Sequence, residues 1–217
     1  MTSACIFDMD GVLIDSGAHH RNAWRALLDE MGVVPTQHDF WRLTIGRPAE
    51  EAVPLLLGRR VSVAEARRLA LRKRDLYGEF AASGLQSVAG VVGFVKTLAR
   101  GGVPRAVGTS ASRGDVDTLL VDLGLRRYFD VIVTADDVRF GKPDPEVYLE
   151  AARQIGERPA ACVVFEDAVV GIQAARRAGM RAIGVTTAHT ADELRAAGAE
   201  STIPDFEGLD WNTVARP

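Results

Sequence analysis

The stretch ACIFDMDG, residues 4–11, decides the fold predicted for this chain. Its four apolar residues are typical of a buried strand, and ligands collect at the carboxyl ends of strands in open parallel sheets. Such a strand delivers Asp8 and Asp10 at that end, and Gly11 then lets the backbone turn sharply. Two carboxylates this close repel each other unless a cation or a shared proton neutralises them. The pair suggests a metal site, acid–base chemistry or both, although by itself it also fits an exposed turn.

Length and composition are those of an ordinary globular protein. The 217 residues allow one large domain or two modest ones. Hydrophobic residues make up 47% of the chain and charged residues 25%, with a formal net charge of −3. This balance predicts no strong attraction to nucleic acid or to a membrane surface. No apolar run approaches the roughly 20 residues that cross a bilayer, and the N-terminus lacks the pattern of a signal peptide.

The two cysteines, Cys5 and Cys162, both lie in apolar, strand-like runs. A free cysteine in such a run usually behaves as a small buried hydrophobe. We therefore expect a reducing, cytoplasmic location. The expected oligomeric state is a monomer or a weak homodimer.

Short apolar runs alternate with helical patterns over most of the chain. The expected strands are residues 4–7, 104–108, 131–133, 161–165, 181–185 and 201–203. The expected helices lie at about residues 90–100, 113–123, 145–155, 169–178 and 191–197. Capping boxes and helix stops flank several of them, at Ser112 with Asp115, Thr190 with Glu193, Gly124, Gly179 and Gly198. The alternation predicts an α/β fold with a doubly wound, mostly parallel sheet and a Rossmann-like core.

Residues 16–83 interrupt this alternation. Four helical stretches fit there instead, at about residues 18–31, 37–43, 49–57 and 63–82, and Thr36 with Asp39 and Ser62 with Glu65 read as capping boxes. Because the insert begins six residues after Asp10, both of its connections lie near the candidate site, as a cap over that site requires. The predicted domains are a core of residues 1–15 and 84–217 and a helical cap of residues 16–83. A purely structural helical subdomain is the alternative.

Polar clusters follow four of the predicted strands, in the order Asp8 and Asp10, Thr109-Ser110, Lys142 within GKPDP (residues 141–145), and Glu166-Asp167. Because the carboxyl ends of parallel strands lie along one edge of a sheet, the clusters should converge there. Each cluster alone also fits a helix cap, a turn or a helix start. The coincidence of four favours a functional site.

The residue types at this edge suit phosphate chemistry with a metal ion. Asp8, Glu166 and Asp167 offer the hard oxygen ligands that Mg²⁺ prefers. Lys142 offers a fixed cation for phosphate oxygens and for Asp8. The hydroxyl of Thr109 or Ser110, with backbone N–H groups at a helix start, can bind a phosphoryl group.

The two aspartates of the first cluster suit separate tasks. Asp8 can attack phosphorus and form an aspartyl-phosphate. Asp10 can protonate the leaving oxygen and then activate water, which is acid–base catalysis worth roughly 10²–10⁴-fold in rate.

The motifs DMDGVLIDS (8–16), TS (109–110), GKPDP (141–145) and FED (165–167) together resemble those of the haloacid dehalogenase-like hydrolases, over nearly the whole chain. The resemblance is to the branch with a helical cap after the first strand, which holds sugar phosphatases, phosphoglycolate phosphatase and β-phosphoglucomutase. It implies Asp8 as nucleophile, Asp10 as general acid–base, and Thr109 and Lys142 as phosphate binders. It also implies Mg²⁺ held by Asp8, the backbone carbonyl of Asp10 and Asp167, with Glu166 beside it. Because dehalogenases proper lack the second aspartate, Asp10 argues against dehalogenation.

Three residues of the predicted cap are candidates for substrate contact: His20, Arg47 and Lys73. His20 and Lys73 resemble cap residues of β-phosphoglucomutase that couple substrate binding to closure and contact substrate. The mutase also carries a lysine and an arginine near Arg47, where this chain has Ile45 and Ala49. A mutase must hold a second phosphate, so the loss of these cations favours hydrolysis.

The sequence therefore predicts a Mg²⁺-dependent phosphatase of small phosphorylated metabolites, with sugar phosphates as the expected substrates. A β-phosphoglucomutase-like sugar-phosphate mutase is the alternative. A third reading, a signalling module phosphorylated on aspartate, conflicts with the motif order and the helical insert. The nucleotide-binding patterns G-x-x-x-x-G-K-[ST] and G-x-G-x-x-G are absent from the sequence.

Overall fold

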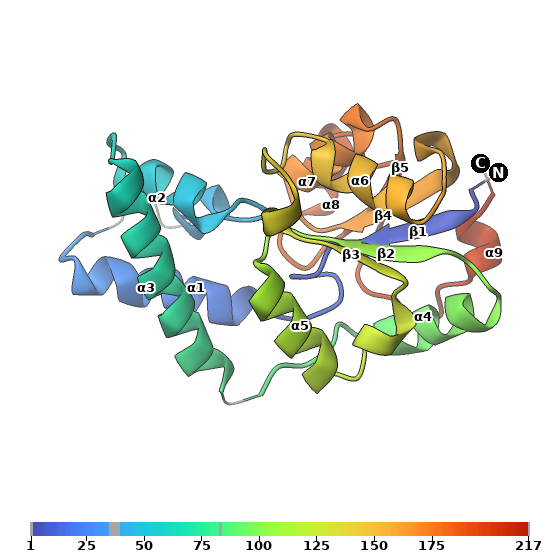
Figure 1. Cartoon of the computed structure of the whole chain (residues 1–217), viewed down its shortest axis with the longest axis horizontal. Coiled ribbons are helices and arrows are strands. Elements are labelled where there is room, and N and C mark those ends of the chain that lie inside the picture. Colours follow the sequence, from blue (N-terminus) through green and yellow to red (C-terminus); the bar gives the residue numbers. More distant parts are fainter. Residues whose placement is uncertain (1, 35–39, 83, 217) are drawn as a thin grey trace.

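The computed structural model describes residues 2–34, 40–82 and 84–216, and all structural statements refer to these. Figure 1 shows a sheet lobe with helices on both faces, and a helical lobe beside it. The helical lobe (the described part of residues 16–83) contains α1 (Gly17–Glu30), α2 (Ala49–Leu57) and α3 (Val63–Ala81). It lies beyond the carboxyl end of the central strand, where the predicted site is expected.

The sheet has six parallel strands in the order β3-β2-β1-β4-β5-β6. They are β1 (Ala4–Phe7), β2 (Arg105–Gly108), β3 (Val131–Val133), β4 (Cys162–Glu166), β5 (Arg181–Val185) and β6 (Ser201–Ile203). The chain builds outward from β1 to one side and then returns to place β4 on its other side. This topological switch point is where open α/β sheets bind ligands. The α/β prediction is confirmed.

Alternate residues of each strand face opposite layers of helices. Phe7 and Phe165 pack with α4 (Val91–Arg100), α5 (Arg113–Asp122) and α9 (Trp211–Val214). On the other face, Ile6 and Val164 pack with helices on the upper side of Figure 1. These helices are α6 (Glu146–Gln154), α7 (Val169–Arg177) and α8 (Ala191–Ala196). Helices on both faces leave the end of the sheet as the accessible place for a ligand.

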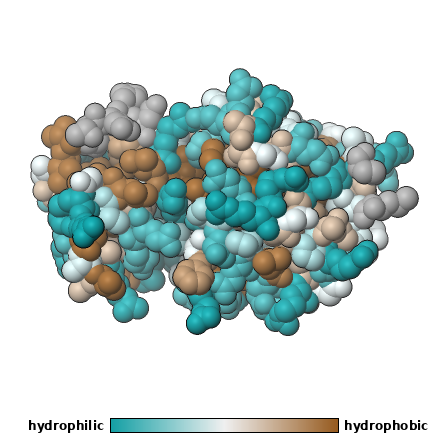
Figure 2. Space-filling view, turned by 90° about the horizontal axis from the view of Figure 1, so that it is seen from above, coloured by the Kyte–Doolittle hydropathy of each residue, from teal (hydrophilic) through white to brown (hydrophobic). Residues whose placement is uncertain are grey.

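The helical lobe has a hydrophobic cluster of its own. Trp24 and Leu28 of α1 pack with Val53 of α2 and Leu69 of α3. The two chain segments that enter and leave the lobe run side by side, because the Asp15 amide donates to the carbonyl of Gln86 at 2.9 Å. Seen from above in Figure 2, hydrophobic residues gather over the helical lobe, whereas the sheet lobe is mostly hydrophilic on this face. The helical lobe thus has a core separate from that of the sheet lobe, and its two connections are hydrogen-bonded to each other.

Most predicted elements form close to their expected bounds. The expected helix at 37–43 appears as a 3-10 helix, Phe40–Leu43, while residues 37–39 and the Thr36–Asp39 capping box lie outside the described residues. The Ser62 hydroxyl accepts from the Glu65 amide, and Thr190 and Glu193 form a complete capping box. Cys5 and Cys162 are buried and unbonded to each other, as predicted. Within the described chain, no helix has both the length and the apolarity needed to cross a membrane.

Candidate active site

Asp8 lies directly beyond the central strand and is almost fully buried. Its backbone amide donates to the carbonyl of Phe165 at 3.0 Å, which continues the pairing of β1 with β4. The chain then turns back at Gly11, whose φ is +73°. A Cβ atom there would lie 1.8 Å from Oδ2 of Asp167. Glycine is therefore required both for the turn and for the close approach of a second carboxylate.

Lys142 forms the buried ionic centre of the site. Its Nζ lies 2.7 Å from Oδ1 of Asp8 and 2.9 Å from Oε1 of Glu166. Glu166 also accepts from the Tyr148 hydroxyl at 3.2 Å and from the Ala168 amide at 2.5 Å. With both of its oxygens occupied, Glu166 fixes the position of Lys142, and Lys142 in turn orients Asp8.

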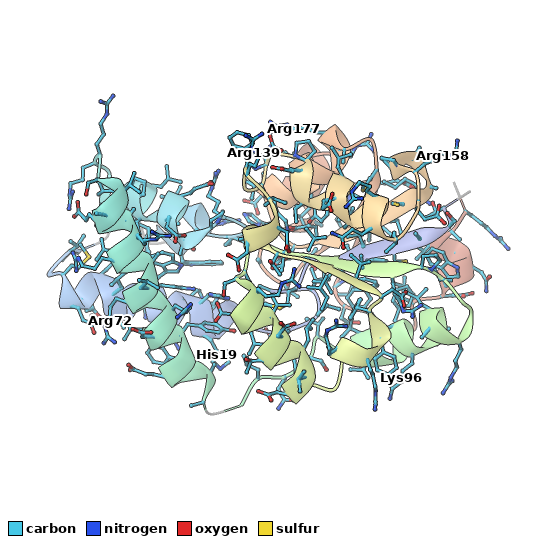
Figure 3. The ribbon with its side chains drawn as sticks, in the orientation of Figure 1. His19, Arg72, Lys96, Arg139, Arg158 and Arg177 are labelled. Carbon is cyan, nitrogen blue, oxygen red and sulfur yellow. The ribbon has the colours of Figure 1, made fainter. Side chains whose placement is uncertain are left out.

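A close approach at Gly171 and hydrogen bonds to the loop that carries Lys142 support this arrangement. A Cβ on Gly171 would lie 1.7 Å from Oε1 of Glu166, so only glycine at that position leaves room for the carboxylate. The loop that carries Lys142 is held by Arg177 at the end of α7, which donates to the carbonyl of Pro143 at 2.8 Å. Figure 3 shows Arg177 and Arg139 above the sheet lobe. The backbone amide of Arg139 donates to Glu146 of α6 at 2.8 Å.

The three acidic side chains crowd together around one lysine. Asp8, Glu166 and Asp167 each place an oxygen within 4.8 Å of the others. Burial raises the pKa of Asp8 to about 7, with Lys142 opposing this and Glu166 adding to it. Burial, and then the charges of Glu166 and Asp8, raise the pKa of Asp167 well above its ordinary value. Buried oxygen donors with excess negative charge fit a hard divalent cation such as Mg²⁺.

Asp10 is held by two residues of the helical lobe. Its Oδ1 accepts from the Ser16 hydroxyl at 2.6 Å and lies 3.0 Å from Nε2 of His20. Nδ1 of His20 lies 2.6 Å from Nζ of Lys73. Because Lys73 only donates, His20 accepts at Nδ1 and donates from Nε2, which is a neutral tautomer. A chain of hydrogen bonds thus links Lys73 to Asp10.

The pKa shifts in this chain follow from burial and charge. Burial, and then the charge of Lys73, lower the pKa of His20 and favour its neutral ring. Burial also lowers the pKa of Lys73 to about 8, and its ammonium lies over the rings of Trp24 and Tyr77. Burial opposes the ionisation of Asp10, but its interactions with His20 and Ser16 outweigh it and lower the pKa to about 2. Asp10 is therefore a carboxylate in this state.

Thr109 and Ser110 lie at the end of β2, on the same edge. Thr109 is buried, and its Oγ1 accepts from the Ala111 amide at 3.1 Å. The Ser110 hydroxyl instead donates to the carbonyl of Gly46 in the helical lobe at 3.1 Å. Ser110 thereby joins the predicted phosphate site to a loop of the helical lobe.

A cavity of about 300 Å³ lies between the two lobes. Its lining includes most of the residues singled out from the sequence: Asp8, Asp10, His20, Arg47, Lys73, Thr109, Ser110 and Asp167. Lys142 and Glu166 are buried, and Lys142 contacts both Asp8 and Glu166. The fold thus brings together all the residues that the sequence singled out.

A family model for haloacid dehalogenase-like hydrolases matches residues 2–179. The chain belongs to this family. Fructose-1-phosphate phosphatase YqaB of Escherichia coli is 37% identical over 83% of this chain and 94% of its own length. Validoxylamine A 7'-phosphate phosphatase of Streptomyces hygroscopicus is 36% identical over 97% of each chain. A hydrolase of the same family from Entamoeba histolytica has a TM-score of 0.88 at 27% identity and covers 99% of this chain and 98% of its own. The prediction of a phosphoric monoester hydrolase is confirmed by these relatives.

Sequence reasoning missed several polar side chains of this haloacid dehalogenase-like site. Tyr148 lies in the first turn of α6, where it reads as part of the apolar face, and its hydroxyl bonds Glu166. Tyr77 stacks on His20 with ring centroids 4.3 Å apart. Thr187 follows β5 and contacts Asp167. Only Thr187 has a signal in the sequence, because the strand-end rule that found the other clusters applies to β5 as well.

Proposed function

We propose that this protein is a Mg²⁺-dependent phosphatase that hydrolyses small phosphorylated metabolites through an aspartyl-phosphate on Asp8. Sugar phosphates are the proposed substrates, and the helical lobe acts as a cap over them. The observation that carries the proposal is the buried Asp8–Lys142–Glu166 ion-pair cluster at the floor of the cavity between the lobes. We further propose a monomer or weak homodimer that needs neither nucleic acid nor a membrane.

Asp8 is the proposed nucleophile because the ammonium of Lys142 favours its ionised form and fixes one of its oxygens. An Asp8 oxygen bonds to phosphorus while the bond from phosphorus to the leaving oxygen breaks. Lys142 also offers its charge to the phosphoryl oxygens, with Thr109 and the backbone amide of Ser110 beside it. Because Glu166 already holds Lys142, its charge needs no rearrangement when phosphate binds.

Asp10 is the proposed acid–base residue. In the first step it gives a proton to the leaving oxygen, and in the second it takes one from the water that attacks phosphorus and frees Asp8. The carboxylate seen here suits the second step. The negative charge of a bound phosphate raises the pKa of Asp10, which favours the protonated form needed first.

The residues proposed to hold Mg²⁺ are Asp8, Asp167 and the backbone carbonyl of Asp10, with Glu166 beside them. When bound, the ion supplies positive charge to the phosphoryl oxygens and to the crowded carboxylates. The excess negative charge around Lys142 supports this assignment.

Two observations support a small sugar-like substrate. The cavity of about 300 Å³ lies at the lower end of the range for ligand pockets. Relatives are named as phosphatases of fructose 1-phosphate and of validoxylamine A 7'-phosphate.

A phosphate-release screen tests the proposal. Sugar phosphates, phosphoglycolate and nucleotides are incubated with the protein in Mg²⁺ and, separately, in EDTA, beside the Asp8→Asn variant. We expect turnover of sugar phosphates that EDTA and the variant abolish. Retained turnover by pure Asp8→Asn protein rejects Asp8 as nucleophile. Conversion of β-glucose 1-phosphate to glucose 6-phosphate with a bisphosphate activator, without free phosphate, supports the mutase instead.

A further inference from the structure

The loop after β5, residues 186–189, reaches the same edge of the sheet as the catalytic candidates. Thr186 anchors it, because its amide donates to the carbonyl of Ile203 at 2.9 Å. Thr187 then donates from Oγ1 to the carbonyl of Gly11 at 2.6 Å, and the same oxygen lies 3.3 Å from Oδ2 of Asp167. Nδ1 of His189 lies 3.0 Å from the backbone carbonyl of Asp167.

The Asp167 carboxylate sits in a slot between Gly11 and Thr187. A Cβ on Gly11 would lie 1.8 Å from Oδ2 of Asp167 and 3.0 Å from Oγ1 of Thr187, so these groups meet around one point. The backbone of Gly11, which has no side chain, forms one wall, and the Thr187 hydroxyl forms the other. The slot restricts where Oδ2 of Asp167 can lie.

We propose that Thr187 is a positioning residue for the metal site, an inference that rests on the proposed function. Thr187 bonds the turn that follows the Asp10 carbonyl, and its hydroxyl oxygen lies against the Asp167 carboxylate, so it contacts the surroundings of two groups assigned to the ion. Its one hydroxyl hydrogen belongs to the shorter bond, to Gly11. Oδ2 of Asp167 therefore keeps its lone pairs for a cation while Thr187 limits its movement.

The test compares cation affinity in variants that change only the hydroxyl. Thr187→Val keeps the branched shape and removes the hydroxyl, Thr187→Ala removes it without a new methyl group, and Thr187→Ser restores it. Thr186→Val is the matched control, because the Thr186 hydroxyl bonds to the carbonyl of Ile203 in β6 and not to Asp167. Binding of Mn²⁺ is measured by the EPR signal of the free ion, and folding by thermal unfolding.

We expect Mn²⁺ affinity to fall about tenfold in Thr187→Val and Thr187→Ala. Thr187→Ser and Thr186→Val should bind as the unmodified protein does. Equal affinity in all variants overturns the positioning role while leaving the metal site intact. An equal loss in Thr186→Val and Thr187→Val also overturns it, since the loop then acts only as a scaffold. Failure of the unmodified protein to bind Mn²⁺ overturns the metal part of the proposed function and this inference with it.

Discussion

Around Asp8 the charged side chains are buried and bond to one another, whereas the contacts that bring the helical lobe onto the sheet lobe are partly exposed and few. Lys142 and Glu166 are 1% and 0% exposed. By contrast, the Arg42–Glu193 pair across the lobes, at 2.5 Å, has side chains that are 32% and 38% exposed. The same type of interaction therefore has different energetic weight in the two regions.

Asp10 also bonds across the lobes, to the side chains of Ser16 and His20. Further contacts between the lobes involve backbone and close packing. Gly46, with a φ of +72°, fits where a Cβ would lie 2.6 Å from Ala168 and 2.8 Å from Val170. A Cβ on Gly141 would lie 2.7 Å from Pro48. These packing contacts with Ala168, Val170 and Pro48 depend on shape and involve no charged group.

The difference teaches how the two tasks of the enzyme are divided. Removing one partner from a buried ion pair costs about 3–5 kcal/mol, whereas an exposed pair contributes about 0–1 kcal/mol. The edge of the sheet is thus fixed before substrate arrives, whereas the helical lobe is joined to it by a partly exposed ion pair, by the Asp10 bonds to Ser16 and His20, and by packing. This division suits the proposed role of the helical lobe as a cap that opens for substrate exchange.

The largest effect is expected from Lys142→Met. It leaves Asp8 and Glu166 adjacent without a cation, so turnover should fall about 10³-fold. The free energy of unfolding should fall by about 3–5 kcal/mol at pH 8. In the unmodified protein Lys142 stays charged between pH 5 and 8, because its pKa is raised in the fold. Protonation of the carboxylates relieves their repulsion in the variant, so the loss should shrink at pH 5.

Urea unfolding at pH 5 and pH 8 measures this difference. Lys142→Arg keeps the charge and serves as the control for it. A stability loss that is the same at both pH values would contradict the ion-pair account.

Lys73→Met should separate activity from stability. Loss of the Lys73–His20–Asp10 chain should lower kcat/KM about 10-fold to 100-fold through misplacement of Asp10. Burial lowers the pKa of Lys73 from 10.5 to about 8, so the buried ammonium costs at most about 3 kcal/mol of stability. The variant should therefore have the higher Tm at pH 7.

The stability cost of burying the Lys73 ammonium depends on pH. Above pH 8 the folded protein loses this proton before the unfolded chain does, so the cost fades and the Tm advantage of the variant should shrink towards pH 10. The kcat/KM of the unmodified enzyme should fall above pH 8, and the pH profile of the variant should lack that fall. Arg72→Met is the matched control, since Arg72 pairs with Glu30 in the helical lobe, far from the sheet lobe in Figure 3. An equal Tm shift in both variants would argue against burial as the cause.

Gly46→Ala should impair docking of the helical lobe without unfolding it. The added Cβ meets Ala168 and Val170, so kcat/KM should fall about tenfold. Gly58→Ala is the control, because its φ of +59° carries similar strain but a Cβ there meets nothing within 4 Å. Both variants should lose about 1–2 kcal/mol from that strain. Steady-state kinetics beside thermal unfolding shows whether only Gly46→Ala loses activity.

The smallest effect is expected from the Arg42–Glu193 pair. A double-mutant cycle with Arg42→Met and Glu193→Gln should give a coupling energy below about 1 kcal/mol, and KM should change less than about threefold. High salt should reduce the coupling further. A coupling of several kcal/mol in urea unfolding would mean that this exposed pair holds the two lobes together strongly.

The sequence predicted the strand ends well because each strand is a short apolar run followed at once by polar residues. Asp8, Asp10, Glu166 and Asp167 were found in this way, and parallel pairing brings them together. Tyr148 was not found, because an aromatic residue on a buried helix face gives no local sign of a hydrogen bond to Glu166. The Ser110 hydroxyl was assigned to phosphate, and only the structure shows its bond to Gly46.

By itself, the sequence determined the parallel sheet, the helical insert and the acidic edge, since local hydrophobic patterning and strand-end chemistry lie within short windows. The tertiary structure decided which charges meet. Lys142 bonds Asp8 across 134 positions, and Lys73 meets His20 across 53. Thr187 reaches Gly11 across 176 positions. Contacts over such separations depend on strand order, on the close approaches at Gly11 and Gly171, and on burial. A local sequence pattern encodes none of these.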